Sequence, residues 1–136
     1  MDIILQTNDS KASLELRHIE FCNGDFFCTL FVESGDFRAE HRFDFSGESL
    51  AQFLCDLIRM DETLVGTGSL GYGSEPDVLI FQTGGRGHIQ VGGLLIANRL
   101  PRQEFRFAFV TDQTCLAPFL RDVRRFLKST PGADFN

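Results

Sequence analysis

Alternation of phenylalanine with charged residues restricts the fold of this chain more than any other feature. Residues 37–45 read FRAEHRFDF, so apolar side chains and His41 take every second position and charged side chains take the positions between them. Residues 104–109, EFRFAF, repeat the placement of rings at every second position. Successive side chains of a strand point to opposite faces, and a period of two is typical of a strand with one face in the core. Both segments are therefore predicted to be half-buried strands.

Weaker alternation predicts six more strands, and turn chemistry predicts how they are joined. These strands are expected at residues 2–6, 12–22, 25–34, 65–72, 77–83 and 86–97. The separators at residues 23–24, 34–36 and 84–87 contain glycine, asparagine or aspartate, which tolerate positive φ and favour hairpins. Short connections of this kind imply antiparallel neighbours.

Two other segments have the spacing of amphipathic helices. The first follows a start at residues 46–49 that is rich in capping residues, and its apolar positions are Leu50, Phe53, Leu54, Leu57 and Ile58. The second follows Thr114, and its apolar positions are Leu116, Phe119, Leu120, Val123 and Leu127. Pro118 is expected in or next to the first turn of the second helix, where its missing N–H costs least.

The two helices also reveal an internal repeat. Residues 50–57, LAQFLCDL, align with residues 116–123, LAPFLRDV, at an offset of 66, and each stretch follows a Phe-x-Phe strand. The predicted fold is α+β, with antiparallel β-meander sheets and two amphipathic helices in the order ββββα-ββββα. A chance similarity between two amphipathic helices is the alternative, because helical periodicity alone forces several matches.

Size and composition favour one globular domain, placed at residues 1–130 with a short tail at 131–136. The chain has 136 residues, of which 43% are hydrophobic and 24% charged, and this is ordinary for a folded domain with one core. Fifteen Phe against one Tyr and no Trp indicate a core of rings without polar groups. No apolar run approaches the ~20 residues that span a bilayer, and no basic segment opens the chain, so we expect a cytoplasmic protein.

Charge is unevenly distributed along the sequence. The formal net charge is −6, with −8 in residues 1–62 and +2 in residues 63–136. Net acidity disfavours nucleic acid as a partner, because affinity for phosphate depends on basic side chains. It favours a basic partner, or none.

Residues 66–71, GTGSLG, match the string GxGxxG of nucleotide-binding proteins, but their context does not. That site needs a strand before the glycines, a helix beginning at them and an acidic residue about 20 positions later. Here a predicted helix comes first, strand and turn patterns follow, and position 91 is Val. The glycines are interpreted as part of a twisted or bulged strand and its turn.

The histidines and cysteines do not form a recognisable metal or catalytic motif. His18, His41 and His88 stand alone in strand-like segments, and no paired ligand spacing occurs, so no metal and no cofactor are predicted. The four cysteines, Cys22, Cys28, Cys55 and Cys115, are interpreted as reduced core or near-core residues. A bridge between Cys22 and Cys28 across their turn stays open as an alternative.

Two further features suggest chemistry but have simpler explanations. Cys115 lies near the start of the second helix, where the helix dipole favours a thiolate, but no histidine lies in that helix or in the strand before it, so a buried structural role is preferred. The basic residues Arg121, Arg124, Arg125 and Lys128 are interpreted as the solvated face of an amphipathic helix. The sequence therefore predicts a non-enzymatic protein.

Several segments together resemble a group of small bacterial proteins that includes immunity proteins of the WapI type. The similarity covers roughly residues 37–129 and rests on residues 40–45 (EHRFDF), the helix at 50–60, residues 86–91 (RGHIQV), residues 107–114 (FAFVTDQT) and the closing helix. The resemblance implies a protein that neutralises a contact-delivered toxin by binding its toxic domain. No residue role is carried over from that group.

Three hypotheses follow. In the first, an immunity-type protein covers a basic toxin surface, and the candidate contacts are Asp25, Glu33, Asp36 and Glu40, around the tip and outer face of the hairpin predicted at residues 25–45. In the second, a ligand-binding or regulatory domain has a pocket between sheet and helices, with residues 66–73 and 86–88 at its mouth. In the third, an enzyme, His41, His88 or Cys115 meets an acidic residue in a cleft.

Overall fold

The computed structural model of the chain describes residues 2–71 and 78–130. The described part contains the strands β1 (Ile3–Gln6), β2 (Ala12–Cys22), β3 (Asp25–Ser34), β4 (Phe37–Ser46), β5 (Thr67–Gly71), β6 (Val78–Gly85), β7 (His88–Ala97) and β8 (Gln103–Asp112). The helices are α1 (Gly47–Thr63) and α2 (Gln113–Ser129). The element order is ββββα twice, which confirms the predicted α+β fold and its duplication.

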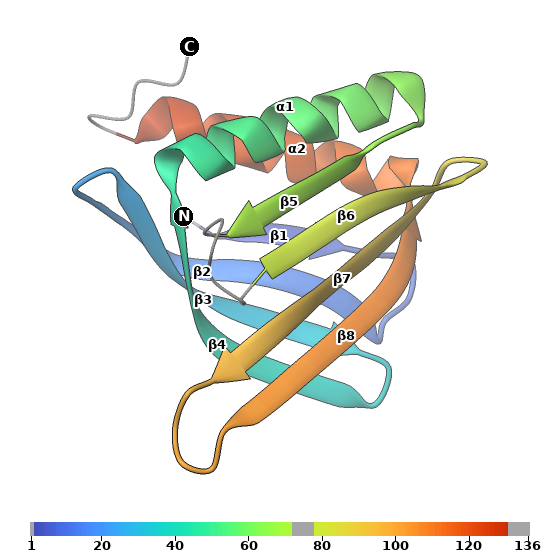
Figure 1. The fold of residues 1–136 in the computed structure, drawn as a ribbon. Helices are drawn as coiled ribbons and strands as arrows, with labels where there is room; N and C mark the ends of the chain where they lie inside the picture. The colour runs from blue at the N-terminus through green and yellow to red at the C-terminus, as the bar shows by residue number, and fades with distance from the viewer. Residues whose placement is uncertain (1, 72–77, 131–136) are drawn as a thin grey trace.

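Each half folds into a four-stranded antiparallel meander followed by its helix. The first sheet has the order β1-β2-β3-β4 and the second the order β5-β6-β7-β8. Figure 1 shows the two sheets crossing below a layer formed by both helices. Each helix packs mainly on the sheet of the other half, because α1 contacts β5 of the second sheet and α2 contacts β1 of the first. The two halves are therefore interlocked.

Equivalent residues begin the two helices. Ser46 is the N-cap of α1, and its side-chain oxygen accepts a hydrogen bond from the backbone N–H of Ser49 at 3.0 Å. Asp112, 66 positions later, is the N-cap of α2 and accepts from the backbone N–H groups of Thr114 and Cys115. An N-cap satisfies donors that have no partner within the helix. The repeat thus includes the strand-to-helix junctions.

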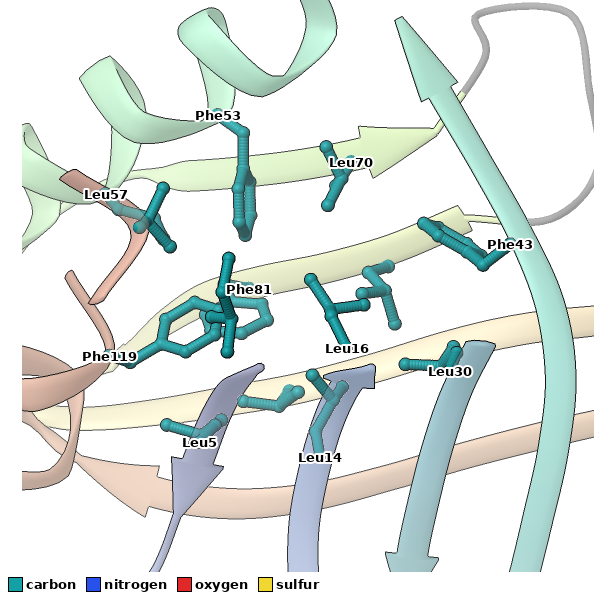
Figure 2. Close-up of a cluster of buried hydrophobic side chains, with 14 of the residues drawn as sticks. Leu5, Leu14, Leu16, Leu30, Phe43, Phe53, Leu57, Leu70, Phe81 and Phe119 are labelled. Carbon is teal, nitrogen blue, oxygen red and sulfur yellow. The ribbon is translucent and has the colours of Figure 1, made fainter. Parts of the chain in front are cut away.

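The core joins the two halves through three phenylalanine rings. Phe53 on α1, Phe119 on α2 and Phe81 on β6 lie with centroids 5.3 to 6.4 Å apart, within the range of favourable ring pairs. Phe53 and Phe119 are equivalent in the repeat. Figure 2 shows these rings together with leucines from β1, β2, β3 and β5. The buried side chains of both halves form one cluster.

The glycines of the GxGxxG string serve the packing of α1 on β5. A Cβ at Gly68 would lie 3.3 Å from the Cβ of Asp56 and 3.5 Å from side-chain atoms of Phe53 and Leu57. Gly66 has a φ of +138°, where L side chains are strained. The interpretation of these glycines as strand residues is confirmed for Thr67–Gly71, which form β5.

Two of the cysteine predictions are wrong. Cys28 is buried and Cys115 is half-buried, but Cys22 and Cys55 are exposed, and all four are free. A register shift in β2 between Arg17 and Glu20 reverses the alternation, so Phe21 faces inward and Cys22 outward. On α1 the buried residues are Gly47, Leu50, Phe53, Leu57 and Met60, and Cys55 lies on the opposite side of the helix.

The remaining predictions about elements differ from the structure only at their ends. The predicted strand at 104–109 extends to Asp112, and α2 begins at Gln113, one residue before Thr114. Pro118 is the sixth residue of α2 and lies inside the helix, in its second turn. The prediction that it lies in or next to the first turn, where its missing N–H costs least, is therefore wrong. The predicted tail at 131–136 and positions 72 and 77 of two predicted strands lie outside the described residues. None of the described helices is long and apolar enough to cross a bilayer.

Candidate protein-binding surface

The outer face of the first sheet carries most of the candidate contacts. Alternation turns most apolar residues of β2, β3 and β4 inward, although Phe27 and Phe31 face outward. The charged residues of the outer face are Glu15, Arg17, Glu20, Asp25, Glu33, Arg38, Glu40, Arg42 and Asp44. These are six carboxylates and three guanidinium groups, which give the face a formal net charge of −3. This face thus carries −3 of the formal net charge of −8 in residues 1–62.

An open hollow of 430 Å³ lies in this face. Its lining includes Glu15, Phe31, Glu33, Arg38 and Glu40. The strand register explains how they meet, because Glu15 pairs with Phe31 across β2 and β3, and Phe31 pairs with Glu40 across β3 and β4. The hollow thus has carboxylates on both sides of an aromatic ring.

Two arginines are held in place within the same hollow. Arg17 forms an ion pair with Glu15, and its guanidinium carbon lies 4.6 Å from the ring centroid of Phe31, within the range of a cation–π contact. Arg38 pairs with Glu33 at 2.7 Å. Glu40 is exposed and makes no ion pair with any residue that the structure describes. The Glu40 carboxylate is therefore free to meet a cation from outside.

The four candidate contacts occupy three places. Glu33 and Glu40 line the hollow. Asp36 lies in the β3–β4 turn and pairs with Lys11 at 3.3 Å, with both side chains largely exposed. Asp25 shares the outer face but stands at the opposite end of β3, eight residues or about 27 Å from Glu33. The structure thus groups Glu33 and Glu40 and separates Asp25 from them.

Glu15, Arg17 and Phe31 belong to the hollow but were not among the sequence candidates. Their signal was present in the alternation of residues 12–22 and 25–34, which predicted both strands. Whether Glu15 and Glu40 flank the same ring depends on the register of three strands. A period of two cannot supply that register, since it assigns faces but not partners.

A second hollow, of 370 Å³, lies at the end of β8. It is lined by Thr7, Asn8, Asp9, His88, Val110, Thr111 and Asp112. The Thr114 hydroxyl donates to the Asp112 carboxylate and holds the pKa of that carboxyl below its ordinary value. His88 lies in this hollow, but the hollow is not the pocket between sheet and helices of the ligand-binding hypothesis, because no residue of α1 or α2 lines it. Arg86 and the described glycines at 66–71 do not line it either.

All four thiols are free, and His88 shares the hollow at the end of β8 with Asp9 and Asp112. Burial raises the pKa of the Cys28 thiol to about 12, with a smaller effect from the charge of Asp44, and this thiol donates to the carbonyl of Phe43 at 3.5 Å. Within residues 2–71 and 78–130, no group of three or more His, Cys, Asp or Glu side chains could hold a metal ion. Arg121, Arg124, Arg125 and Lys128 are all exposed on α2, which confirms their interpretation as its solvated face.

Comparison of the chain with protein families, with curated proteins and with solved structures finds no match.

Proposed function

We propose that this protein is a non-enzymatic binding protein of the immunity type, which neutralises a toxin domain by covering a basic surface of that domain. The observation that carries the proposal is the hollow on the outer face of the first sheet, where Glu40 stands unpaired beside Glu33 and Glu15. A lysine or arginine of the partner would enter the hollow and pair with Glu40. The resemblance of residues 37–129 to a group of small bacterial proteins that includes WapI-type immunity proteins motivates the same proposal.

Electrostatics support a basic protein partner. The face has a formal net charge of −3 on a chain whose formal charge is −6. Complementary charge steers association and raises its rate, and salt weakens this steering. The two arginines of the hollow are already paired with carboxylates, so the unpaired charge that it offers is negative.

The test is binding to a toxin domain encoded beside this gene, measured by calorimetry at low and high salt. Glu33→Lys combined with Glu40→Lys is expected to weaken binding by roughly 100-fold, because two close charge pairs become repulsive. Glu104→Lys is the matched control, since Glu104 is also an exposed carboxylate on an outer sheet face, that of β8. Its affinity should stay within about threefold of the unmodified protein.

Asp25 and Asp36 are tested by the same reversal. Asp36→Lys removes a pair with Lys11 at the hairpin tip, and Asp25→Lys changes the far end of β3. If the toxin covers the whole outer face, each reversal weakens binding. If it contacts the hollow alone, only the Glu33 and Glu40 variants lose affinity. Unchanged binding of the double variant at residues 33 and 40 would reject this face as the contact surface.

Small-ligand binding or regulation is the second candidate function, and the 370 Å³ hollow around His88 favours it. Asp9 and Asp112 line the hollow beside His88, so it offers both a hydrogen-bonding ring and carboxylates. A thermal-shift screen of small polar and cationic compounds tests this function. A compound that stabilises the protein, and loses its effect in His88→Ala, would support it.

A further inference from the structure

The outer face of the second sheet differs sharply from that of the first. Twelve of its outward residues lie in three rows across β5, β6, β7 and β8, namely Thr67-Gln82-Gln90-Val110, Ser69-Ile80-Gly92-Ala108 and Gly71-Val78-Leu94-Arg106. The outward Glu104 lies beyond the third row, on β8. Arg106 is the one charged residue among these twelve positions. Ile80 is 38% exposed and Val110 is 61% exposed. The face is thus apolar to neutral on a strongly acidic protein.

The middle row is stepped. Ile80 projects from β6, whereas its neighbours on β7 and β8 are Gly92 and Ala108. An open hollow of 590 Å³ lies over these small residues, lined by side chains from all three rows. The step is built in, because a Cβ at Gly92 would lie 3.1 Å from the carbonyl oxygen of Phe107. Ile80 therefore forms a ridge on β6, and Gly92 and Ala108 form a trough beside it on β7 and β8.

We propose that this face binds a second copy of the chain, with the two second sheets packed face to face about a twofold axis. The axis runs parallel to the strands and passes between β6 and β7. This rotation places β6 of each copy over β7 of the other, and β5 over β8. A twofold contact must be self-complementary, since each surface meets its own copy.

Every row satisfies that requirement. In the middle row Ile80 of each copy lies over Gly92 of the other, so the ridge fills the trough twice. In a second row Val78 meets Leu94. In the third row Gln82 faces Gln90, and two side-chain amides can exchange hydrogen bonds. Arg106 lies over Gly71, so no like charges meet.

Charge distinguishes a second copy from other occupants. Two first-sheet faces would repel each other, because each carries a net charge of −3. The second-sheet face is close to neutral, so two copies can meet there without repulsion, and its three rows offer no line of charges to select a charged partner. Twelve positions per copy are fewer than the roughly 20–30 residues per side of a standard interface. The dimer is therefore expected to dissociate on dilution, and it leaves the first-sheet face open.

Sedimentation equilibrium over a wide concentration range tests the proposal. The unmodified protein should approach about twice its chain mass of 15.3 kDa as its concentration rises. Ile80→Arg places a charge in each trough and should raise the dissociation constant by at least about 30-fold. Ile4→Arg is the matched control, because Ile4 is also 38% exposed, on β1 of the first sheet. Its dissociation constant should be unchanged.

A charge-complementation experiment identifies the axis. One variant carries Gln82→Glu and Gln90→Glu, and another carries Gln82→Lys and Gln90→Lys. Each alone should be monomeric, since like charges face one another across the twofold, and an equimolar mixture should form heterodimers. Circular dichroism of each variant confirms that it is folded, so a monomer does not result from unfolding.

Three outcomes would overturn the proposal. The first is an unmodified protein that stays monomeric at the highest concentrations. The second is a dimer that survives Ile80→Arg in the folded variant, and the third is a mixture of the two charged variants that stays monomeric. The proposal does not rest on toxin binding, because the two surfaces are separate. Loss of affinity for a toxin in the Glu33 and Glu40 variants and loss of dimerisation in the Ile80 variant are read independently.

Discussion

β4 and β8 occupy equivalent places in the two halves, 66 positions apart, yet their outward residues differ. On β4 these residues are Arg38, Glu40, Arg42 and Asp44, and on β8 they are Glu104, Arg106, Ala108 and Val110. Four charges in the first half thus correspond to two charges and two apolar residues in the second. The fold places no demand on these side chains, because they do not enter the core. The outer faces were therefore free to acquire separate roles.

The inward residues of the same strands show the opposite behaviour. Phe43 on β4 corresponds to Phe109 on β8, and both are buried. Where the two strands do differ inward, a neighbour compensates. β8 has Phe107 where β4 has His41, and the residue paired with it on β7 is Gly93, where β3 has Leu30. A Cβ at Gly93 would lie 2.8 Å from the Phe107 ring, so the volume lost at one position is filled from the other.

The largest effect on stability is expected from removing the rings of Phe53 and Phe119, which occupy equivalent positions in the two halves. Phe53→Ala and Phe119→Ala are each expected to lower the free energy of unfolding by about 3–5 kcal/mol, because both rings are buried and the cavity cannot collapse. Denaturant titration measures both. The exposed Leu100→Ala is the control and should change stability by less than about 0.5 kcal/mol. A nearly neutral result for either ring would show that the halves do not share one core.

How much of the fold can be predicted from the sequence depends on where apolar and polar residues alternate without interruption. The bounds of β2 and β3 agree with prediction, because the turn residues at 23–24 and 34–36 mark where these strands end. The strand predicted at 104–109 stops short of the observed end of β8 at Asp112. Beyond Phe109 the apolar Val110 faces outward and the polar Thr111 faces inward, so apolar residues no longer mark the inward positions on which the prediction depends. The register shift beside His18, whose φ is 54°, has no signal in a single sequence and changed the face of Cys22.

The candidate site was less predictable than the fold. Residues 25–45 were predicted to form a hairpin, and this placed Glu33 and Glu40 on one face. The contribution of β2 required the register of a third strand, and the unpaired state of Glu40 required knowing that Arg38 turns to Glu33 instead. Such choices depend on side-chain geometry, which composition and spacing do not determine.

The two N-caps give a smaller and more specific test of the repeat. Ser46→Ala should cost about 1 kcal/mol and Asp112→Ala about 1–2 kcal/mol of stability, because Asp112 accepts from two backbone N–H groups and Ser46 from one. Thermal unfolding measures both. Equal costs, or a larger cost for Ser46→Ala, would contradict the geometry of the caps.

The caps should also differ in pH dependence. The Asp112 pKa is lowered in the folded state from its ordinary value of 3.8, so the charged form stabilises the fold fully above that value. This contribution is lost as the pH falls through the lower, folded-state pKa. The stability difference between the unmodified protein and Asp112→Asn should therefore shrink in acid. Ser46→Ala is the control, because the serine hydroxyl does not titrate there.

The smallest effect is expected at Thr111, where the second half has a polar residue in place of the buried Phe45 of the first. Thr111 is 6% exposed, and its hydroxyl oxygen has no hydrogen-bond partner among the described residues. Thr111→Val keeps the shape and removes the unsatisfied group, so it should raise the free energy of unfolding by up to about 1 kcal/mol. Denaturant titration compares it with Thr29→Val, the same change at a half-buried threonine on the outer face of β3. A loss of stability in Thr111→Val alone would mean that this hydroxyl makes a hydrogen bond on which the second half depends.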